Sequence, residues 1–332
     1  MKLTQVAALP SLCRTRDKER QNLTIAVAQL RWQQDTTRHA SNIAEAGRLA
    51  SETGADLLLL PELTLSRYPA DTRPHPDRRA ELAEALASGP TTALLSAIAK
   101  SNGIWIVGSL FERNATAETG GYNTAVLYSP QGAIAAATRK IHIPVTEGYF
   151  EDEYFTPGPV ELAPKVHELQ IAGNPKLGMP TCWDEWFPEL ARDLALAGAD
   201  LLCYPTAIGS EPDHPNFDTS ELLIKTVTGH AIANGLFIAV PNRWGDEGRL
   251  NFYGKSFVVD PFGRTLAQAA SDSDELLVVE LDLDQRRDWL ELFPFFATRR
   301  PQAYASLVNP MDNPRRQDGR AQLGGIPGIQ PW

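Results

Sequence analysis

Residues 176–197, KLGMPTCWDEWFPELARDLALA, join a short apolar run, a cysteine and the start of a helix. The apolar run reaches Thr181, and Cys182 follows it directly. Pro188 suits the first turn of a helix, where its missing N–H costs nothing, and Gly198 suits the end of that helix. The pattern predicts a strand, a turn that carries Cys182, and a helix, as in α/β proteins.

Cys182 is the strongest candidate for a reactive side chain. A thiol between a strand and a helix lies near the positive end of the helix dipole and near backbone N–H groups without partners. Both features favour a thiolate and can stabilise an oxyanion. A free cysteine more often only packs, as we expect for Cys203 in its apolar run. Cys13 lies in a polar leader without a partner.

The overall composition describes an ordinary globular chain. Its 332 residues suffice for one large α/β domain or two smaller ones, and 43% are hydrophobic. The formal net charge is −10, with no basic stripe, so we expect no nucleic-acid partner. Three cysteines without a pairing pattern favour a reducing compartment.

The sequence does not predict membrane association. No apolar run approaches the roughly 20 residues that span a bilayer. The apolar part of the leader MKLTQVAALPSLC is too short for a signal peptide and is broken by polar residues. We therefore expect a cytoplasmic enzyme.

The rest of the chain alternates predicted strands and helices. An apolar run over 23–30, helical spacing over 35–53 and a second apolar run over 56–60 form a βαβ unit with parallel strands. Further helices are expected at 91–102, 188–197 and 218–235. Further strands are expected at 104–110, 123–129, 133–139, 166–172, 176–181, 200–204, 236–241, 252–259 and 274–281, with a turn at Gly245.

These elements predict a layered α/β sandwich with its helices outside, since a TIM barrel needs a more regular alternation. We expect a loose N-terminal extension over 1–22, one domain over 23–304, and a tail over 305–332. The tail is either disordered or an arm on a partner subunit. The sequence has no CxxC or HExxH cluster and no glycine-rich phosphate loop, so neither a metal nor a cofactor is expected.

Glu62, Lys140 and Cys182 each follow an apolar run directly. Chemistry in open α/β sheets gathers at the carboxyl ends of strands. A carboxylate, an ammonium group and a thiol are the base, oxyanion stabiliser and nucleophile of a thiol-based acyl transfer. A Cys–His pair is the alternative, with His142, His214 and His230 as candidates.

Three motifs occur in order along the chain: Pro61-Glu62, Arg139-Lys140-x-His142-x-Pro144 and Gly178-x-x-x-Cys182-Trp183-Asp184-x-x-Phe187-Pro188-Glu189. Their order and spacing resemble the nitrilase, or carbon–nitrogen hydrolase, superfamily over residues 23–304. The resemblance implies an αββα sandwich whose copies pair into homodimers or larger homo-oligomers. It also implies a small-molecule substrate and no cofactor.

The resemblance also assigns roles within the site. Cys182 would be the nucleophile, Glu62 the general base and Lys140 the stabiliser of the tetrahedral intermediate. Glu151, in the run Tyr149–Gly158, would be a second, substrate-orienting glutamate. The backbone N–H of Trp183 would be another oxyanion donor. The expected substrate-binding residues are Tyr68, Thr206 and Asn242.

The chain departs from the family pattern before the cysteine, where Pro180 and Thr181 replace branched aliphatic residues. Proline removes a ladder N–H from a strand that should be central. We therefore expect a bulge or local exposure at Pro180.

Within the superfamily, the runs 182–189 and 204–212 and Gly229-His230-Ala231 are most similar to N-carbamoylputrescine amidases. This implies hydrolysis of N-carbamoylputrescine to putrescine, CO2 and ammonia, the last step of the agmatine route, through a thioester. Acidic and aromatic residues over 145–155 and 208–218 would receive the cationic tail. Arg67 would instead favour an N-carbamoyl amino acid. An aliphatic amidase, a nitrilase and a catalytically silent binding scaffold remain alternatives.

Overall fold

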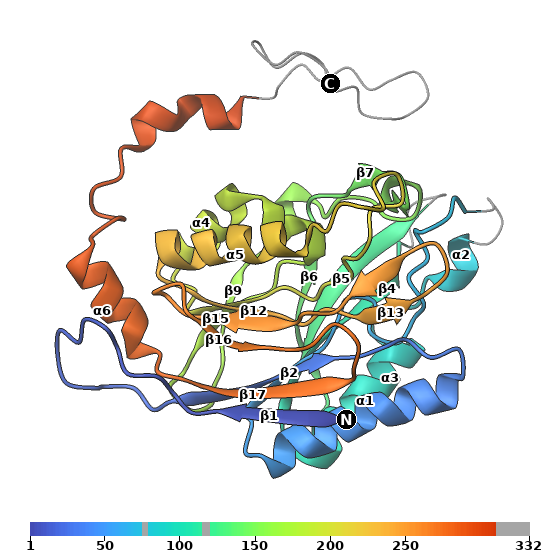
Figure 1. The fold of residues 1–332 in the computed structure, drawn as a ribbon, viewed down its shortest axis with the longest axis horizontal. Helices are drawn as coiled ribbons and strands as arrows, with labels where there is room; N and C mark the ends of the chain where they lie inside the picture. Colours follow the sequence, from blue (N-terminus) through green and yellow to red (C-terminus); the bar gives the residue numbers. More distant parts are fainter. Residues whose placement is uncertain (75–78, 115–119, 310–332) are drawn as a thin grey trace.

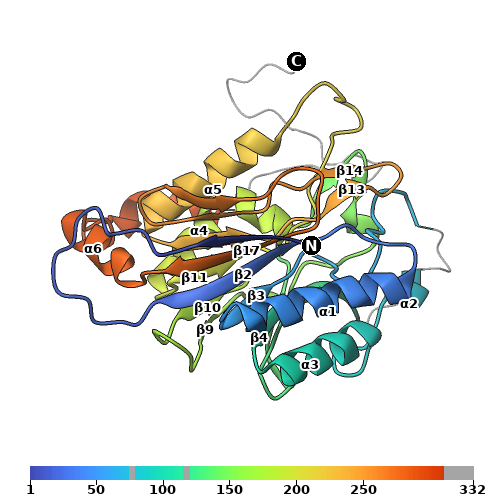
Figure 2. The same cartoon turned by 60° about the horizontal axis from the view of Figure 1, so that its bottom comes forward.

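The computed structural model describes residues 1–74, 79–114 and 120–309. In this part of the chain, two sheets lie face to face between two layers of helices (Figures 1 and 2). Helices α1 and α3 cover the outer face of the first sheet, and α4 and α5 cover the outer face of the second. The arrangement is the expected αββα sandwich in one domain.

The first sheet has the strand order β1-β17-β2-β3-β4-β5-β6. Strands β2 and β3 are parallel, as predicted for the βαβ unit. Strands β5 and β6, which were expected over 123–129 and 133–139, pair as an antiparallel hairpin. The bounds are β1 (Lys2–Val6), β2 (Leu23–Gln29), β3 (Leu57–Leu59), β4 (Trp105–Arg113), β5 (Gly121–Tyr128), β6 (Ile134–Arg139) and β17 (Glu275–Leu281).

The second sheet has the order β16-β15-β12-β11-β10-β9, and two small hairpins lie outside both sheets. The sheet consists of β9 (Val166–Glu168), β10 (Lys176–Gly178), β11 (Leu201–Cys203), β12 (Phe237–Val240), β15 (Phe257–Val259) and β16 (Thr265–Gln268). The hairpins are β7 (Val145–Thr146) with β8 (Tyr149–Phe150), and β13 (Trp244–Asp246) with β14 (Asn251–Tyr253).

The helices follow the cues in the sequence. Asp35 caps the first helix by accepting from Thr37 N and Arg38 N, and Pro90 opens the third helix. The α-helices are α1 (Thr36–Glu52), α2 (Arg79–Leu82), α3 (Pro90–Asn102), α4 (Pro188–Leu196), α5 (Ser220–Asn234) and α6 (Asp284–Leu292). The 3-10 helices are η2 (Glu151–Glu153), η3 (Val160–Leu162), η4 (Cys182–Trp186) and η5 (Pro301–Val308).

The main core lies between the two sheets, where inward side chains of both sheets pack together. Val27 and Leu59 come from the first sheet, and Leu177 and Ala239 come from the second. Separate apolar clusters join each sheet to its helices. Strands buried on both faces explain why their sequences are continuously apolar.

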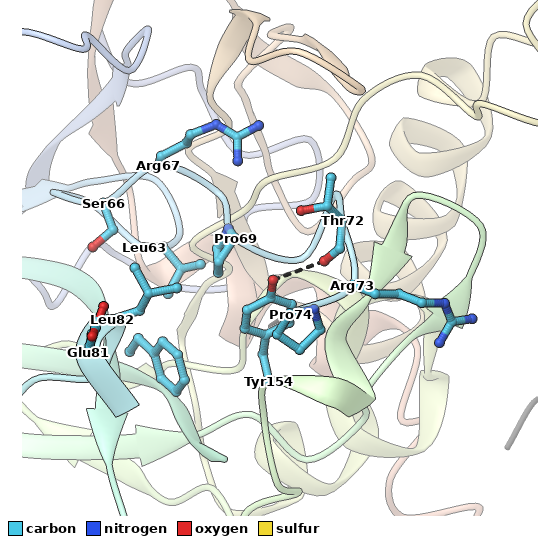
Figure 3. Close-up of a pocket in the computed structure, with 11 residues that line it drawn as sticks. Leu63, Ser66, Arg67, Pro69, Thr72, Arg73, Pro74, Glu81, Leu82 and Tyr154 are labelled. Carbon is cyan, nitrogen blue, oxygen red and sulfur yellow. Dashed lines mark hydrogen bonds between the residues drawn. The ribbon is translucent and has the colours of Figure 1, made fainter. Parts of the chain in front are cut away.

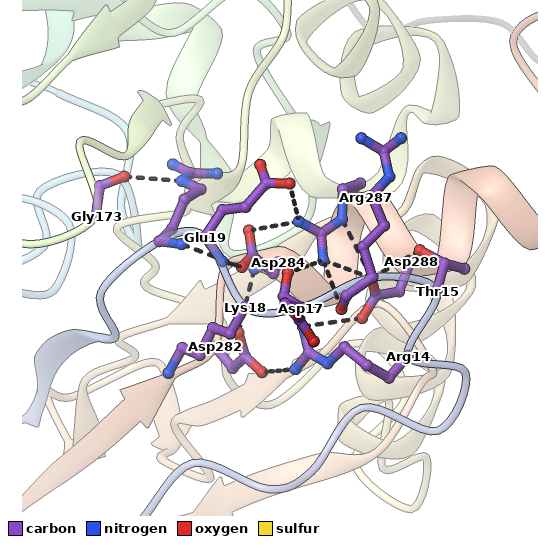
Figure 4. Close-up of polar contacts among 12 residues, drawn as sticks. Arg14, Thr15, Asp17, Lys18, Glu19, Gly173, Asp282, Asp284, Arg287 and Asp288 are labelled. Atoms are coloured by element: carbon purple, nitrogen blue, oxygen red, sulfur yellow. Dashed lines mark hydrogen bonds and ion pairs between the residues drawn. The ribbon is translucent and has the colours of Figure 1, made fainter.

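The expectation of a loose extension over 1–22 is wrong for the residues of β1, which pair in parallel with β17 at the sheet edge. Residues 14–20 then run along α6, and Figure 4 shows how charged side chains hold them there. Arg14 contacts Asp282 and lies 3.1 Å from Asp288 Oδ2, and Glu19 N donates to Asp284. These contacts fix a polar segment that has no apolar pattern of its own.

Three other local predictions need correction. Strand β10 ends before Pro180, so the expected bulge does not form; proline simply ends the ladder. The predicted strand over 252–259 is two strands, because Gly254 and Lys255 have positive φ angles of 63° and 54°. Gly245 lies inside β13 and not in a turn.

Residues 301–308 form η5, which projects from the body beyond α6 (Figure 1). The predicted tail over 305–332 therefore begins within η5, and its residues 310–332 lie outside the described residues. Among the described helices, none has the length and hydropathy needed to cross a bilayer.

Candidate active site

The carboxyl ends of strands from both sheets bring Glu62, Lys140 and Cys182 together. Glu62 follows β3, Lys140 directly follows β6, and Cys182 follows β10. Glu151 approaches from η2, after the β7–β8 hairpin. All of these side chains are buried, with 3% or less of each residue exposed. The structure therefore brings these four predicted residues together at one edge of the sandwich.

Lys140 forms the centre of the polar contacts. Its Nζ lies 3.0 Å from Glu62 Oε1 and 2.7 Å from Glu151 Oε2. Tyr68 donates its hydroxyl hydrogen to Glu151 Oε1 at 2.8 Å, which brings this predicted binding residue into the site. Both oxygens of Glu151 are thus held, and the carboxylate orients the ammonium group.

Glu62 is held at one oxygen only. Asn123 Nδ2 donates to Glu62 Oε1 at 2.6 Å, the same oxygen that Lys140 contacts. Glu62 Oε2 is buried and has no hydrogen-bond partner within the described ranges. A carboxylate fixed at one oxygen and open at the other is suited to accept a proton. Sequence reasoning missed Asn123, whose only signal is an amide inside an otherwise apolar strand.

Cys182 lies at a strained position, at the start of η4, with a φ angle of 46°. A positive φ is uncommon for a residue other than glycine and often marks a functional site. The backbone N–H of Trp183 lies in the first turn of η4, where an N–H has no partner within the helix. The turn therefore presents both a thiol and a backbone donor.

The prediction that the helix end favours a thiolate is wrong. Helix α4 begins only at Pro188, beyond η4. Burial raises the pKa of the Cys182 thiol well above its ordinary value, and Glu62 raises it further, although Lys140 opposes the rise. Cys182 is therefore a thiol at rest, and it needs a base to become a nucleophile.

The pKa values of Glu151 and Lys140 are both raised. Burial raises the pKa of Glu151 to about 7, against the opposing effect of Lys140. Burial alone would lower the pKa of Lys140, but Cys182, Glu151 and Glu62 raise it well above its ordinary value. Lys140 therefore stays an ammonium ion and can stabilise an oxyanion.

Asp184 connects the two halves of the site. One of its oxygens accepts from His142 N at 3.0 Å and lies 2.7 Å from His142 Nδ1, and the other accepts from Thr181 N at 3.0 Å. His142 also stacks on Phe187, with ring centroids 3.6 Å apart. His142 is thus engaged with Asp184, and the Cys–His alternative finds no support in this histidine.

Two predicted binding residues hold backbone instead. Asn242 accepts from Ile208 N and donates to Ile208 O and Gly254 O, so its amide groups are occupied. Thr206 donates its hydroxyl hydrogen to Tyr204 O at 2.7 Å. Both residues hold the loop after β11 through these backbone contacts.

Arg67 lines a cavity of about 520 Å³ next to the site (Figure 3). Its guanidinium group pairs with Asp71 and donates to the backbone oxygens of Tyr68 and Glu247. These partners occupy the group that was the candidate receptor for a substrate carboxylate. The cavity is lined by Leu63, Ser66, Arg67, Pro69, Thr72, Arg73, Pro74, Glu81, Leu82, Phe111 and Tyr154.

A second cavity, of about 300 Å³, lies between the 209–219 loop and the β14–β15 turn. Tyr253 lines it, and Cys182 and Glu185 contribute to the raised pKa of this buried phenol, after burial itself. Asp218 and Lys255 also line it, with Nζ 3.4 Å from Asp218 Oδ2. This cavity therefore offers both signs of charge near the thiol.

The chain is similar to known proteins over most of its length. The sequence model described as "Carbon-nitrogen hydrolase" matches residues 24–291. The chain is 33% identical to the citrullinase of Francisella tularensis, covering 86% of this chain and 98% of that protein. It is 35% identical to the N-carbamoylputrescine amidase of Arabidopsis thaliana, covering 81% and 90%.

Solved structures share the fold of this chain over most of its length. A carbon-nitrogen hydrolase from Helicobacter pylori superposes with a TM-score of 0.76 and 31% identity, covering 87% of this chain and 99% of that one. A mutant amidase from Nesterenkonia sp., with acrylamide added to its active-site cysteine, has a TM-score of 0.69 and 29% identity, covering 86% and 100%.

Proposed function

The chain belongs to the carbon-nitrogen hydrolase family, an enzyme family with amidase members, and we propose that it hydrolyses N-carbamoylputrescine through Cys182. The observation that carries the proposal is the buried set in which Lys140 joins Glu62 to Glu151 beside the thiol. Nucleophile, base and oxyanion stabiliser are all present, which argues against a silent scaffold.

In the first half of the reaction, Glu62 Oε2 takes the thiol proton while the sulfur bonds to the carbamoyl carbon. The carbonyl oxygen becomes negative, and Lys140 and the Trp183 N–H stabilise it. Glu62 then protonates the leaving nitrogen, the C–N bond breaks, and a thioester remains on Cys182.

In the second half, Glu62 takes a proton from water, whose oxygen attacks the thioester carbon. The C–S bond breaks, and the proton returns to the sulfur. The carbamate that is released then loses CO2 as its remaining C–N bond breaks, and the nitrogen of putrescine takes up a proton. One water is consumed, and the products are putrescine, CO2 and ammonia. Glu62 acts alternately as base and acid.

The cavity beside Tyr253 supports recognition of a cationic tail. Asp218 is largely exposed, and hydrogen bonds from Ser220 lower the pKa of its carboxyl group, so it is negative. Glu211 is half-buried on the same loop. Burial raises the pKa of Tyr149, and the charge of Glu211 raises it further. The Tyr149 ring packs edge-on against Tyr68. Acidic groups thus lie on the flank where the tail of a short carbamoyl amine would extend.

A ureido amino acid is the second candidate, because Lys255 lies beside Asp218 in this cavity. An α-amino acid carries an ammonium and a carboxylate, which these two side chains complement. The citrullinase relative supports the same reading. Arg67 is the weaker receptor for a carboxylate, since Asp71 already occupies it.

The test is ammonia release by the purified protein. The panel contains N-carbamoylputrescine, N-pentylurea, citrulline, N-carbamoyl-β-alanine, hexanamide and hexanenitrile. N-pentylurea replaces the ammonium group with methyl, so a preference of roughly tenfold for N-carbamoylputrescine would report the tail contact. Preference for citrulline would favour the second candidate, and N-pentylurea performing equally would contradict a cationic tail.

The matched variants are Asp218→Asn and Asp213→Asn, both on the same loop. Asp213 is exposed and does not line the cavity. Asp218→Asn should reduce the preference for the cationic substrate roughly three- to tenfold, as expected for a partly exposed charge. Asp213→Asn should retain it.

We also propose that the enzyme acts in the cytoplasm as a homo-oligomer. The three cysteines are free, as a reducing compartment would keep them, and Cys182 must stay reduced to react. The exposed apolar residues of η5, including Leu307 and Val308, suit contact with a second copy.

A further inference from the structure

Glu185 is a further carboxyl group beside Cys182. A 3-10 helix has three residues per turn, so side chains at i and i+3 lie above one another. Cys182 and Glu185 have this spacing in η4. Trp183 and Trp186, also three apart, have ring centroids 6.3 Å apart, as this periodicity requires. Glu185 therefore lies on the same edge of the helix as the thiol.

The Glu185 side chain is buried and forms no ion pair within the described residues. The residue is 0% exposed, and neither carboxyl oxygen accepts or donates a hydrogen bond within residues 1–74, 79–114 and 120–309. Glu62 and Glu151 share Lys140, whereas Glu185 has no such contact. A buried carboxylate without a cation is costly, so the group takes up a proton. Burial first, and then Glu62, raise its pKa well above the ordinary value.

The neighbours of Glu185 determine which of its oxygens is available. Thr206 lies beside the carboxyl group, and its own hydrogen is donated to Tyr204 O. The Thr206 oxygen therefore offers lone pairs to the acid hydrogen of Glu185. The carbonyl oxygen of Glu185 is then left as an acceptor, and the nearby Tyr204 hydroxyl also lacks a partner in the described structure.

We propose that the Glu185 carbonyl oxygen accepts a hydrogen bond from an N–H of the substrate and thereby selects ureido compounds. A ureido group has N–H groups on both sides of its carbonyl carbon, an amide on one side, and a nitrile on neither. Glu62 serves the nitrogen that leaves, and Glu185 serves the nitrogen that remains. This inference rests on the proposed hydrolysis of a carbamoyl amine.

The test compares the binding of two ligands that differ in one group. In 6-aminohexanamide a CH2 replaces the inner N–H of N-carbamoylputrescine, while length and charge stay the same. Calorimetry on the Cys182→Ala variant measures both affinities without turnover. We expect N-carbamoylputrescine to bind roughly tenfold more tightly or better, as for one buried hydrogen bond.

Two further variants, made in the Cys182→Ala background, test whether Glu185 causes this preference for N-carbamoylputrescine. Glu185→Met, of similar length but without a polar atom, should reduce the ratio of affinities to within about threefold of unity. Glu185→Gln keeps an acceptor oxygen and should retain the ratio. Thermal melts check that each variant folds.

The results distinguish failure of the proposed function from failure of the proposed role of Glu185. If neither ligand binds, the proposed function fails. Equal binding of the two ligands to Cys182→Ala overturns the role of Glu185, even where Glu185→Met does not fold. An unchanged ratio in Glu185→Met, or a ratio lost in Glu185→Gln, also overturns it.

Discussion

The number of hydrogen-bond partners distinguishes the carboxyl groups around Cys182. Glu151 is held at both oxygens and Glu62 at one, while neither oxygen of Glu185 has a partner in the described chain. A group held at both oxygens can orient a neighbour, and one held at a single oxygen can still move a proton. These differences support the proposed roles, which are orientation for Glu151 and proton transfer for Glu62.

The pKa of Glu151, raised by burial to about 7 from 4.5, predicts a pH effect. Below pH 7 the group is neutral and holds Lys140 less firmly, so kcat/KM should rise as pH increases through about 7. Glu151→Gln should lack this limb and lose roughly 10- to 100-fold in kcat/KM. Rate profiles from pH 5 to 9 check this, and an unchanged limb in the variant would assign it elsewhere.

The same shift has a stability consequence. Because the pKa is higher in the folded than in the unfolded chain, the contribution of Glu151 to stability is fully present below pH 4.5. It is lost as pH rises through about 7. Denaturant titrations at pH 5 and pH 8 should show a smaller difference for Glu151→Gln than for wild type.

The sequence predicts those site residues that directly follow an apolar run. Glu62, Lys140 and Cys182 end apolar runs, and strand ends meet at one edge. Asn123 and Glu185 could not be predicted, because a polar residue beside apolar ones ordinarily indicates exposure. Their burial depends on the partners that the fold supplies.

At the scale of elements, Asp184 ties η4 to the segment after β6. It binds Thr181 N on one side and His142 on the other, and it is fully buried. Cys182 and Lys140 are thereby held in fixed positions relative to one another. The strained φ of Cys182 needs such a constraint to persist.

Asp184→Ala should therefore lower both stability and activity. Hydrogen bonds to a buried carboxylate are lost, which should cost about 2–4 kcal/mol. Asp184→Asn keeps an acceptor and should cost less. Urea unfolding and kcat/KM measure the two effects. A variant with normal stability and normal kcat/KM would show that Asp184 does not hold η4.

Element boundaries followed the sequence where the helical spacing of apolar residues was strong, as for α1 and α4. Helix α6 was missed, because its buried residues, Asp284, Gln285 and Asp288, are polar and give no apolar stripe. Strand β1 was missed because it is a largely exposed edge strand. Both elements depend on contacts between the chain ends, which no local pattern reports.

Helix η5 is exposed along its whole length. Its residues are all exposed, including Tyr304, Leu307 and Val308, and Figure 1 shows it beyond the helical layer. Exposed apolar side chains also lie on α4 and α5, at Leu196 and Leu222. We propose that η5 packs against a second copy of the chain.

Ending the chain at Arg300 should therefore decrease the size of the assembly in solution. Sedimentation of full-length and shortened protein measures this. The matched control, Leu307→Asp with Val308→Asp in the full chain, should have the same effect if apolar contact is the cause. An identical assembly in all three would contradict an interface role for η5.

In the proposed mechanism Cys182 carries the acyl group, and ammonia release by Cys182→Ala, measured beside Cys203→Ala, tests this role. Cys203 lies in the core between the sheets and controls for loss of a buried thiol. We predict that Cys182→Ala loses roughly 10³-fold or more of kcat while melting like wild type, and that Cys203→Ala retains turnover. Substantial turnover by a folded Cys182→Ala protein would contradict the mechanism.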